Sequence, residues 1–389
     1  MLLADDLVER TRPHAHSERR AFVESITQRP NRRIRLGCAE KVEVVAHNAP
    51  VYARLGKAPR IEDMKLAILD LVSVSQDQPV SDAIEAAMQA AELADELGYE
   101  RVWYAEHHNT AAVASSATAL LIGQAAARTK RIRVGSGGIM LPNHAPLNVA
   151  EEFGTLHQLF PGRIDLGLGR APGTDQLTAR ALARSSAEPQ EFMRNVQMMQ
   201  AWFGEGAVGG IEVGVAKGTN VPMWMLGSSD AGATMAGMLG LPYSFASHFA
   251  PDMLHAAIQI YKDNFNPDAP TARIDAPYVQ VGVNVLAHET PGEAEHQFTT
   301  TQNMFSALRR HGGRTPLQPP TDTPEGTSLE VQMMEHALRV RAVGTPDVVA
   351  ARLQDIQRDT GADEIIGVTY SFDPQVRLNS LRLVADAVL

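Results

Sequence analysis

Three short motifs within residues 106–170 decide the fold that this sequence predicts. They read Glu106-His107-His108, VGSGGIMLP at 134–142 and RIDLGLGR at 163–170. Each lies where a short apolar run gives way to polar residues or glycine, and a helix-like segment follows each time. In a β/α barrel the strands end at one face, and reactive groups lie on those ends and on the loops after them. These motifs therefore predict a barrel with functional residues at the carboxyl ends of its strands.

From Met64 onward, strand-like and helix-like segments alternate. The predicted strands cover residues 65–69, 101–104, 132–136, 164–168, 222–226, 243–247, 279–286 and 364–369. The predicted helices cover residues 80–97, 117–129, 146–160, 189–203, 231–239, 251–265, 291–310, 329–341, 346–360 and 374–388. Such alternation indicates right-handed βαβ units and a parallel sheet. Eight units favour closure into a (β/α)8 TIM barrel, although the spacing also fits an open doubly wound sheet.

The barrel domain is predicted to span residues 64–389, with insertions after its fourth and seventh strands. The inserted connections are 204–220, which is rich in glycine, and 311–329, which is longer than a compact fold needs. Residues 1–63 are rich in Arg and Pro and keep neither a helical nor a strand period. We therefore expect them to form a poorly ordered N-terminal extension.

Charge and cysteine content exclude several classes of protein. The net charge is −10, yet residues 1–63 hold 12 Lys and Arg against 9 Asp and Glu, so residues 64–389 are strongly acidic. An acidic domain without a basic stripe argues against nucleic acid and anionic membranes as partners. Cys38 is the only cysteine, which excludes an intrachain disulfide and a cysteine-based metal site. Without a signal sequence or a run of about 18 apolar residues, a soluble cytoplasmic protein is expected.

His107 and His108 are the candidate acid–base residues, because they follow the predicted strand 101–104. An imidazole can donate, accept or carry a proton near neutral pH. Neighbours in a strand point to opposite faces, so we expect only one of the two rings to enter the barrel mouth. The alternatives are two structural histidines or a zinc pair. Adjacent histidines on a strand suit a shared metal less well than an i,i+4 pair on a helix, so no metal site is predicted.

Glycines and anion-binding groups follow three other strands. The glycines at 135–138 fit either a close approach of a flat ligand or a simple strand-to-loop transition. Arg170 follows the fourth strand, where its guanidinium could hold an anion. Gly227, Ser228 and Ser229 precede a helix, so they offer either a phosphate site or an ordinary helix N-cap. Phosphate sites after late strands are common in these barrels.

Taken together, these motifs resemble the bacterial luciferase-like flavin monooxygenase family. The resemblance covers about residues 64–388. Besides the motifs above, it includes LPNHAP at 141–146, FPGR at 160–163, GTD at 173–175, LGSS at 226–229 and ASHF at 246–249. The order and spacing of these pieces make the resemblance specific.

The resemblance implies a TIM barrel that binds reduced FMN with the isoalloxazine over the barrel mouth. It implies that His107 is the catalytic histidine and that a non-prolyl cis peptide joins Gly137 and Gly138 under the flavin. The implied cofactor-binding residues are Glu106, Gly137, Gly138, Arg170, Arg180, Gly227, Ser228 and Ser229. The family's reactive cysteine is replaced by Gly169, which argues against light emission and long-chain aldehyde oxidation.

The implied activity is that of a flavin-dependent monooxygenase. A separate NAD(P)H:flavin reductase would deliver reduced FMN, which would react with O2 to a C4a-hydroperoxide and oxygenate a small organic substrate. A homodimer is expected from the same resemblance. Two alternatives remain open: a deazaflavin (F420)-dependent oxidoreductase of the same superfamily, which transfers hydride, and a non-catalytic flavin-binding protein. The sequence does not identify the substrate.

Overall fold

The computed structural model describes residues 64–389 except 172–173, 183–184, 312 and 314. The extension predicted for residues 1–63 therefore lies outside the described residues. Within the described range, no helix is both long and apolar enough to cross a membrane.

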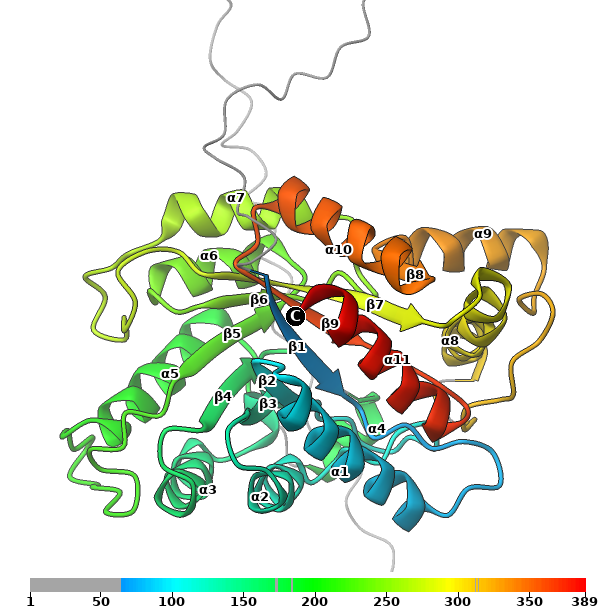
Figure 1. Cartoon of the computed structure of the whole chain (residues 1–389). Helices are drawn as coiled ribbons and strands as arrows, with labels where there is room; N and C mark the ends of the chain where they lie inside the picture. Colours follow the sequence, from blue (N-terminus) through cyan, green and yellow to red (C-terminus); the bar gives the residue numbers. More distant parts are fainter. Residues whose placement is uncertain (1–63, 172–173, 183–184, 312, 314) are drawn as a thin grey trace, which may run out of the picture. The chain divides into compact units, whose positions relative to one another are not determined.

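Eight parallel strands close into a barrel, which confirms the predicted (β/α)8 fold (Figure 1). The strand order is β6-β5-β4-β3-β2-β1-β9-β7, and pairing of β6 with β7 completes the ring. The barrel strands are β1 (Lys65–Asp70), β2 (Arg101–Tyr104), β3 (Arg133–Met140), β4 (Ile164–Gly169), β5 (Met223–Gly227), β6 (Tyr243–Phe245), β7 (Val279–Ala287) and β9 (Glu364–Val368).

Helices surround the barrel on its outside (Figure 1). They are α1 (Val80–Leu97), α2 (Thr118–Arg128), α3 (Pro146–Leu159), α4 (Gln176–Ala181), α5 (Pro189–Phe203), α6 (Asp230–Met238), α7 (Leu254–Asn264), α8 (Pro291–His311), α9 (Ser328–Ala337), α10 (Pro346–Thr360) and α11 (Pro374–Val388), with a short 3₁₀ turn, η2, at Leu141–Asn143. Proline opens α3, α5, α10 and α11, where its missing N–H costs no hydrogen bond. Gly98 and Gly361 end α1 and α10 in the left-handed conformation that favours glycine.

The predicted insertions after the fourth and seventh strands are present. After β4 the chain forms α4, α5 and a long connection to β5, and after β7 it forms α8, α9 and a further strand, β8 (Arg341–Gly344). β8 pairs with residues 284–287 of β7, starting at Asn284, where the pairing of β7 with β9 ends. The predicted helix 329–341 is therefore wrong at its end, where Arg341 begins β8. A four-residue strand is too short to show a period of its own in the sequence.

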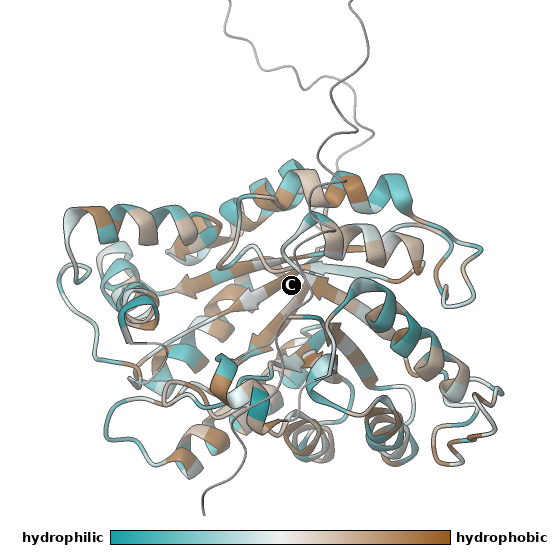
Figure 2. Ribbon diagram, turned by 180° about the vertical axis from the view of Figure 1, so that it is seen from behind, coloured by the Kyte–Doolittle hydropathy of each residue, from teal (hydrophilic) through white to brown (hydrophobic). Residues whose placement is uncertain are grey.

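Two apolar layers follow the alternation of the strands. On β1, Leu66 and Ile68 pack outward into the core beneath the helices, whereas Ala67 and Leu69 point into the barrel. The interior cluster also holds Trp103 and Trp224, whose rings meet edge to face at 5.0 Å. Figure 2 shows the same division, with apolar strands inside and polar outer faces on the helices.

Charged groups close the amino-terminal end of the barrel interior. Arg101 donates to Glu364 at 2.8 Å and to Asp165 at 2.7 Å, and both carboxylates are fully buried. Trp103 and Gln280 donate to the same two carboxylates. Since every buried charge in this layer has an opposite partner, the layer forms a stable floor. The interior is thus open only toward the carboxyl ends of the strands.

Candidate active site

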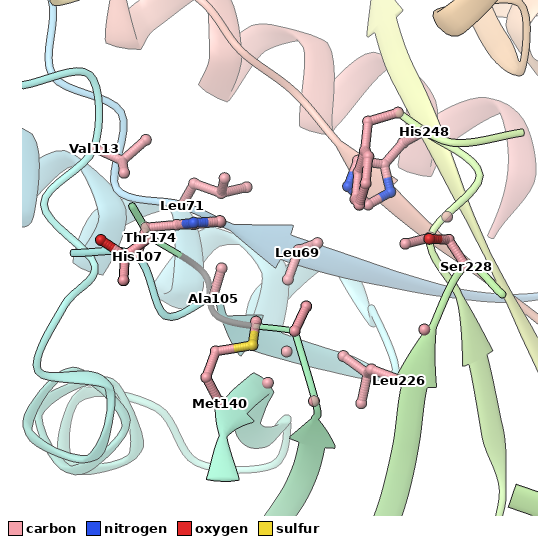
Figure 3. A pocket seen from close by; sticks show the side chains of 18 of the residues that line it. Leu69, Leu71, Ala105, His107, Val113, Met140, Thr174, Leu226, Ser228 and His248 are labelled. Carbon is pink, nitrogen blue, oxygen red and sulfur yellow. The ribbon is translucent and has the colours of Figure 1, made fainter. Parts of the chain in front are cut away.

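A cavity of about 880 Å³ opens at the carboxyl ends of the barrel strands, within the size range of small-molecule and cofactor sites. Side chains from the barrel strands and from α8 line it (Figure 3). Most of them are apolar, and the larger ones include Leu69, Leu71, Trp103, Met140, Leu226, Phe249, Met304, Phe305, Leu308 and Tyr370. The cavity can therefore hold a largely apolar ligand away from bulk water.

Both His107 and His108 line this cavity. The strand geometry behind the expectation that only one ring enters the mouth does not apply, because β2 ends at Tyr104 and the two histidines lie in the loop that follows. In that loop His107 donates its backbone N–H to the carbonyl of Ser115 at 2.9 Å. The His108 ring bonds to Glu106 through Nε2, and which of the two rings enters the mouth stays a prediction.

Glu106 lies behind the histidines instead of in the cavity lining. Its carboxylate is fully buried and accepts hydrogen bonds from three side chains and one backbone N–H. The donors are His108 at 2.8 Å, His144 at 2.9 Å, Asn143 at 3.2 Å and the N–H of Met140 at 2.9 Å. Glu106 thus links the loops after β2 and β3, and it is not among the residues that line the cavity.

The charges of this cluster are mutually stabilising. Burial alone would raise the pKa of Glu106, but hydrogen bonds from His144, His108 and the Met140 N–H outweigh it and lower that pKa to about 2. Burial likewise opposes a charge on His144, yet the hydrogen bond and negative charge of Glu106 raise the His144 pKa above its ordinary value. The pair therefore favours a carboxylate next to an imidazolium.

Gly137 and Gly138 lie within β3 and line the cavity, joined by a non-prolyl cis peptide bond. The register between β3 and β4 shifts between Ser136 and Ile139, and the Ser136 hydroxyl bridges the gap by bonding to both the N–H and the carbonyl of Gly167. A Cβ at Gly138 would lie 2.7 Å from the Gly167 carbonyl oxygen. Glycine here thus serves two needs, close packing on β4 and a bare backbone beside the cavity.

Potential anion-binding groups lie on the β4 and β5 side of the cavity. Arg170, Gly227, Ser228 and Ser229 all line it. Ser229 is also the N-cap of α6, because its hydroxyl accepts from the N–H of Gly232 at 3.2 Å. Ser228 lies at the cavity wall (Figure 3), next to the positive N-terminal end of α6.

Arg180 lies on α4, where its side chain is exposed and does not line the cavity. Arg180 therefore does not join Arg170 in the cavity lining. Among the described residues, no three His, Cys, Asp or Glu side chains are placed to hold a metal ion.

His248 is a cavity residue to which the sequence analysis gave no role, although it lies within the ASHF motif. It follows β6, just as His107 follows β2, so its position after a barrel strand was the available signal. In Figure 3 the rings of His107 and His248 lie on opposite sides of the cavity. His248 is buried, with only 7% of the residue exposed.

Comparison with known proteins gives consistent matches. Residues 64–364 match the family model described as luciferase-like monooxygenase. A luciferase-like monooxygenase of Escherichia coli is 43% identical over 82% of this chain and 96% of its own length. Among solved structures, apo-MsnO8 is 33% identical with a TM-score of 0.76, covering 83% of this chain and 98% of its own.

More distant structures share the fold alone. The oxygenating constituent of 3,6-diketocamphane monooxygenase from Pseudomonas putida, solved in complex with FMN, is 18% identical with a TM-score of 0.64, covering 84% of this chain and 98% of its own. An F420-dependent secondary alcohol dehydrogenase is 14% identical with a TM-score of 0.62 and similar coverage, 84% and 99%. With a family model matching most of its length and close relatives along the whole barrel, the chain belongs to the luciferase-like monooxygenase family.

Proposed function

We propose that this protein is an FMN-dependent monooxygenase that uses reduced FMN and O2 to oxygenate a small organic substrate. The observation that carries the proposal is one continuous cavity with an apolar chamber at the barrel mouth and anion-binding groups on one side. We further propose that a separate NAD(P)H:flavin reductase supplies the reduced FMN. Membership of a monooxygenase family and the FMN complex of a fold neighbour both support this choice of cofactor.

The phosphate of FMN fits the side of the cavity formed by β4 and β5. Arg170 would supply a charge-assisted hydrogen bond, and its guanidinium is held in place by donation to the Ala187 carbonyl at 3.1 Å. Ser228 and the first N–H groups of α6 would complete the contacts with the phosphate oxygens. Glu106, which is buried behind the cavity, would act only through the histidines that it orients.

The isoalloxazine ring fits the apolar part of the cavity. The backbone of Gly137 and Gly138 leaves room for a flat ring system, because neither residue carries a side chain there. Leu69, Leu71 and Met140 line the same chamber and would exclude water from the reacting atoms. These contacts would bind and orient the ring without charged groups.

Bound reduced FMN would supply the two electrons of the reaction, in which one atom of O2 enters the substrate and the other leaves as water. Within this chamber, His107 would hold or transfer a proton at the reacting oxygen through its imidazole. The apolar walls would keep water from that oxygen, since water would divert the reaction to peroxide release. Arg170 and Ser228 would hold the phosphate throughout and thereby fix the ring relative to His107.

Anaerobic titration with reduced FMN and, separately, with reduced deazaflavin tests this proposal. We expect saturable binding of FMN, and after admission of O2 a transient absorbance that matches neither reduced nor oxidised FMN. Binding of the deazaflavin alone would instead support the hydride-transfer alternative. FMN binding with immediate reoxidation and quantitative peroxide would support the flavin-binding protein without turnover.

A further inference from the structure

We propose that His248 recognises the substrate by donating a hydrogen bond from Nε2 to a carbonyl oxygen on an otherwise apolar molecule. This inference rests on the proposed function, because it assumes that the substrate enters the same cavity as the flavin. It adds a substrate class and a specificity-determining residue. Three features of the structure support it: the rigid seat of the ring, the placement of its two nitrogens and the chemistry of the surrounding walls.

The ring of His248 is held on several sides. Asn284 donates from Nδ2 to the His248 carbonyl at 2.6 Å, which fixes the backbone. The ring meets Phe249 edge to face, with centroids 4.8 Å apart and an interplanar angle of 80°. It also lies directly on β7, because a Cβ built at Gly282 would come within 2.5 Å of Nδ1. The imidazole is therefore positioned before any ligand arrives, which lowers the entropic cost of binding.

The two ring nitrogens have different surroundings. Nδ1 is fully buried and has no hydrogen-bond partner among the described residues. Nε2, unlike Nδ1, is not buried without a partner, and it belongs to a ring that lines the cavity. It is therefore the nitrogen that a ligand can reach. A buried N–H without a partner is rarer and more costly than an unpaired acceptor. The favoured tautomer therefore carries its proton on Nε2 and presents a donor to the cavity.

The imidazole remains neutral. Burial, and then the neighbouring charge of His107, lower the pKa of His248 to about 3. Among the described residues, the other ionisable side chains that line the cavity are His107, His108, Arg170, Asp175 and Tyr370, of which Asp175 is exposed. A neutral N–H brings no charge to offset the burial of a carboxylate or phosphate, which would go to the guanidinium of Arg170 instead, so a neutral oxygen is the acceptor that fits opposite His248.

The walls of the cavity restrict the remainder of the substrate. Phe249, Met304, Phe305, Leu308 and Tyr370 line the cavity together with His248. A ligand with many polar groups would bury them here without partners, at a cost of about 1–3 kcal/mol each. A single acceptor on a hydrocarbon skeleton satisfies the donor of His248 and leaves the rest of the molecule in apolar contact. A ketone, ester or amide carbonyl meets both conditions.

The tautomer can be measured directly. Two-dimensional ¹⁵N NMR of the full-length protein loaded with oxidised FMN, compared with His248→Phe for assignment, would show which nitrogen carries the proton. We expect a neutral ring protonated at Nε2 between pH 6 and about 9. A proton on Nδ1, or a ring that becomes charged within this range, would overturn the proposal.

Recognition can be tested with a matched pair of probes, acetophenone and ethylbenzene, which differ in the carbonyl group. In the FMN-loaded protein, titration of carbonyl-¹³C acetophenone should give a saturable shift of the carbonyl signal. We expect His248→Phe to weaken acetophenone binding about 2- to 10-fold, the effect of one neutral hydrogen bond, and to leave ethylbenzene within about twofold. His248→Gln should retain most of the affinity, because its amide nitrogen can replace Nε2 as donor.

A second variant, Gly282→Ala, tests the same contact if His248→Phe does not fold. Gly282→Ala keeps the imidazole but forces it away from β7, so we expect the same selective loss for acetophenone. Equal losses for both probes, no loss in either variant, or no saturable carbonyl shift in the wild type would each overturn the role of His248. A parallel FMN titration separates this failure from failure of the proposed function. If FMN does not bind, the probes are titrated into the flavin-free protein with the same criteria.

Discussion

His144 Nε2 lies 2.9 Å from one carboxylate oxygen of Glu106 and 3.0 Å from the other, although the two residues are 38 positions apart. Glu106 lies in the loop after β2 and His144 follows η2 after β3. The same carboxylate binds His108. The contact thus ties two cavity loops together and orients a cavity histidine from behind.

The Glu106–His144 pair should make stability depend on pH. Because the pKa of Glu106 is lower in the folded protein than in the unfolded chain, where it is about 4.3, the carboxylate stabilises the fold at pH values above about 4.3. This contribution is lost as the pH falls toward 2. The raised pKa of His144 stabilises the fold below about 6.5, and this contribution is lost as pH rises through the folded value. Both contributions are complete between about pH 4.5 and 6.5. Glu106→Gln should therefore lower the thermal midpoint more at pH 5.5 than at pH 9.

Thermal denaturation of both proteins at the two pH values checks this prediction. At pH 5.5 we expect a loss of about 1.5–3 kcal/mol, the usual range for hydrogen bonds to a charged group. Glu335→Gln is a matched control, because its partner Arg341 keeps its charge over this range and the pair lies outside the cavity. An equal midpoint shift at pH 5.5 and pH 9 for Glu106→Gln would contradict the assignment of the pair.

Much of the barrel could be predicted because its elements have strong local signals. The bounds of α1, β2, α5, α10 and α11 agree with the sequence patterns to the residue, since proline, glycine and apolar periodicity define them locally. β3 was predicted too short: its glycines suggested a loop, whereas the structure continues the strand through them with a shifted register against β4. That shift depends on packing between strands, which a single segment does not encode.

The site was only partly predictable for a similar reason. His107, Arg170 and Ser228 follow barrel strands, so their approach to one cavity follows from topology. The bond between Glu106 and His144 depends on how two loops fold back, and no spacing in the sequence reveals it. Strand alternation also does not apply at His107 and His108, because β2 ends two residues before the motif begins.

Arg170→Ala should weaken FMN binding about 10- to 100-fold, because one charge-assisted contact with the phosphate is lost. Riboflavin, which lacks the phosphate, should bind with nearly unchanged affinity. Arg180→Ala is the matched control, since Arg180 is exposed on α4 away from the cavity lining. Fluorescence titration of the three proteins with both flavins is the measurement. Equal losses for FMN and riboflavin in Arg170→Ala would remove Arg170 from the phosphate site.

Alanine at the two cavity glycines should have different effects. A Cβ at Gly138 would press on the Gly167 carbonyl of β4 at 2.7 Å, which is backbone and cannot move aside cheaply. A Cβ at Gly137 would instead meet Cδ1 of Leu69 at 2.5 Å, a side-chain end that can turn into the cavity. We expect Gly138→Ala to lower the thermal midpoint more, by several degrees, and Gly137→Ala mainly to weaken flavin binding. The reverse order in denaturation and titration would contradict this packing.

The last prediction separates the two neighbouring histidines, both of which line the cavity. His108 is bonded to the buried carboxylate of Glu106, and its carbonyl accepts from Thr174 at 3.2 Å, so it supports the loop. His108→Ala should therefore act mainly on stability, with a loss of about 1.5–3 kcal/mol from the charged hydrogen bond. His107→Ala should instead shorten the lifetime of the transient flavin absorbance, or lower the yield of oxygenated product, by about 10²-fold or more, as expected for a positioned acid–base group.

Rapid-mixing absorbance with saturating reduced FMN, together with denaturation of both variants, checks this division of roles. FMN binding should survive in His107→Ala, because the proposed phosphate contacts come from β4, β5 and α6. If His107→Ala reacted normally while His108→Ala lost the transient absorbance at full stability, the roles of the two rings would be exchanged. If neither variant changed the reaction, the acid–base role proposed for this loop would have to be withdrawn.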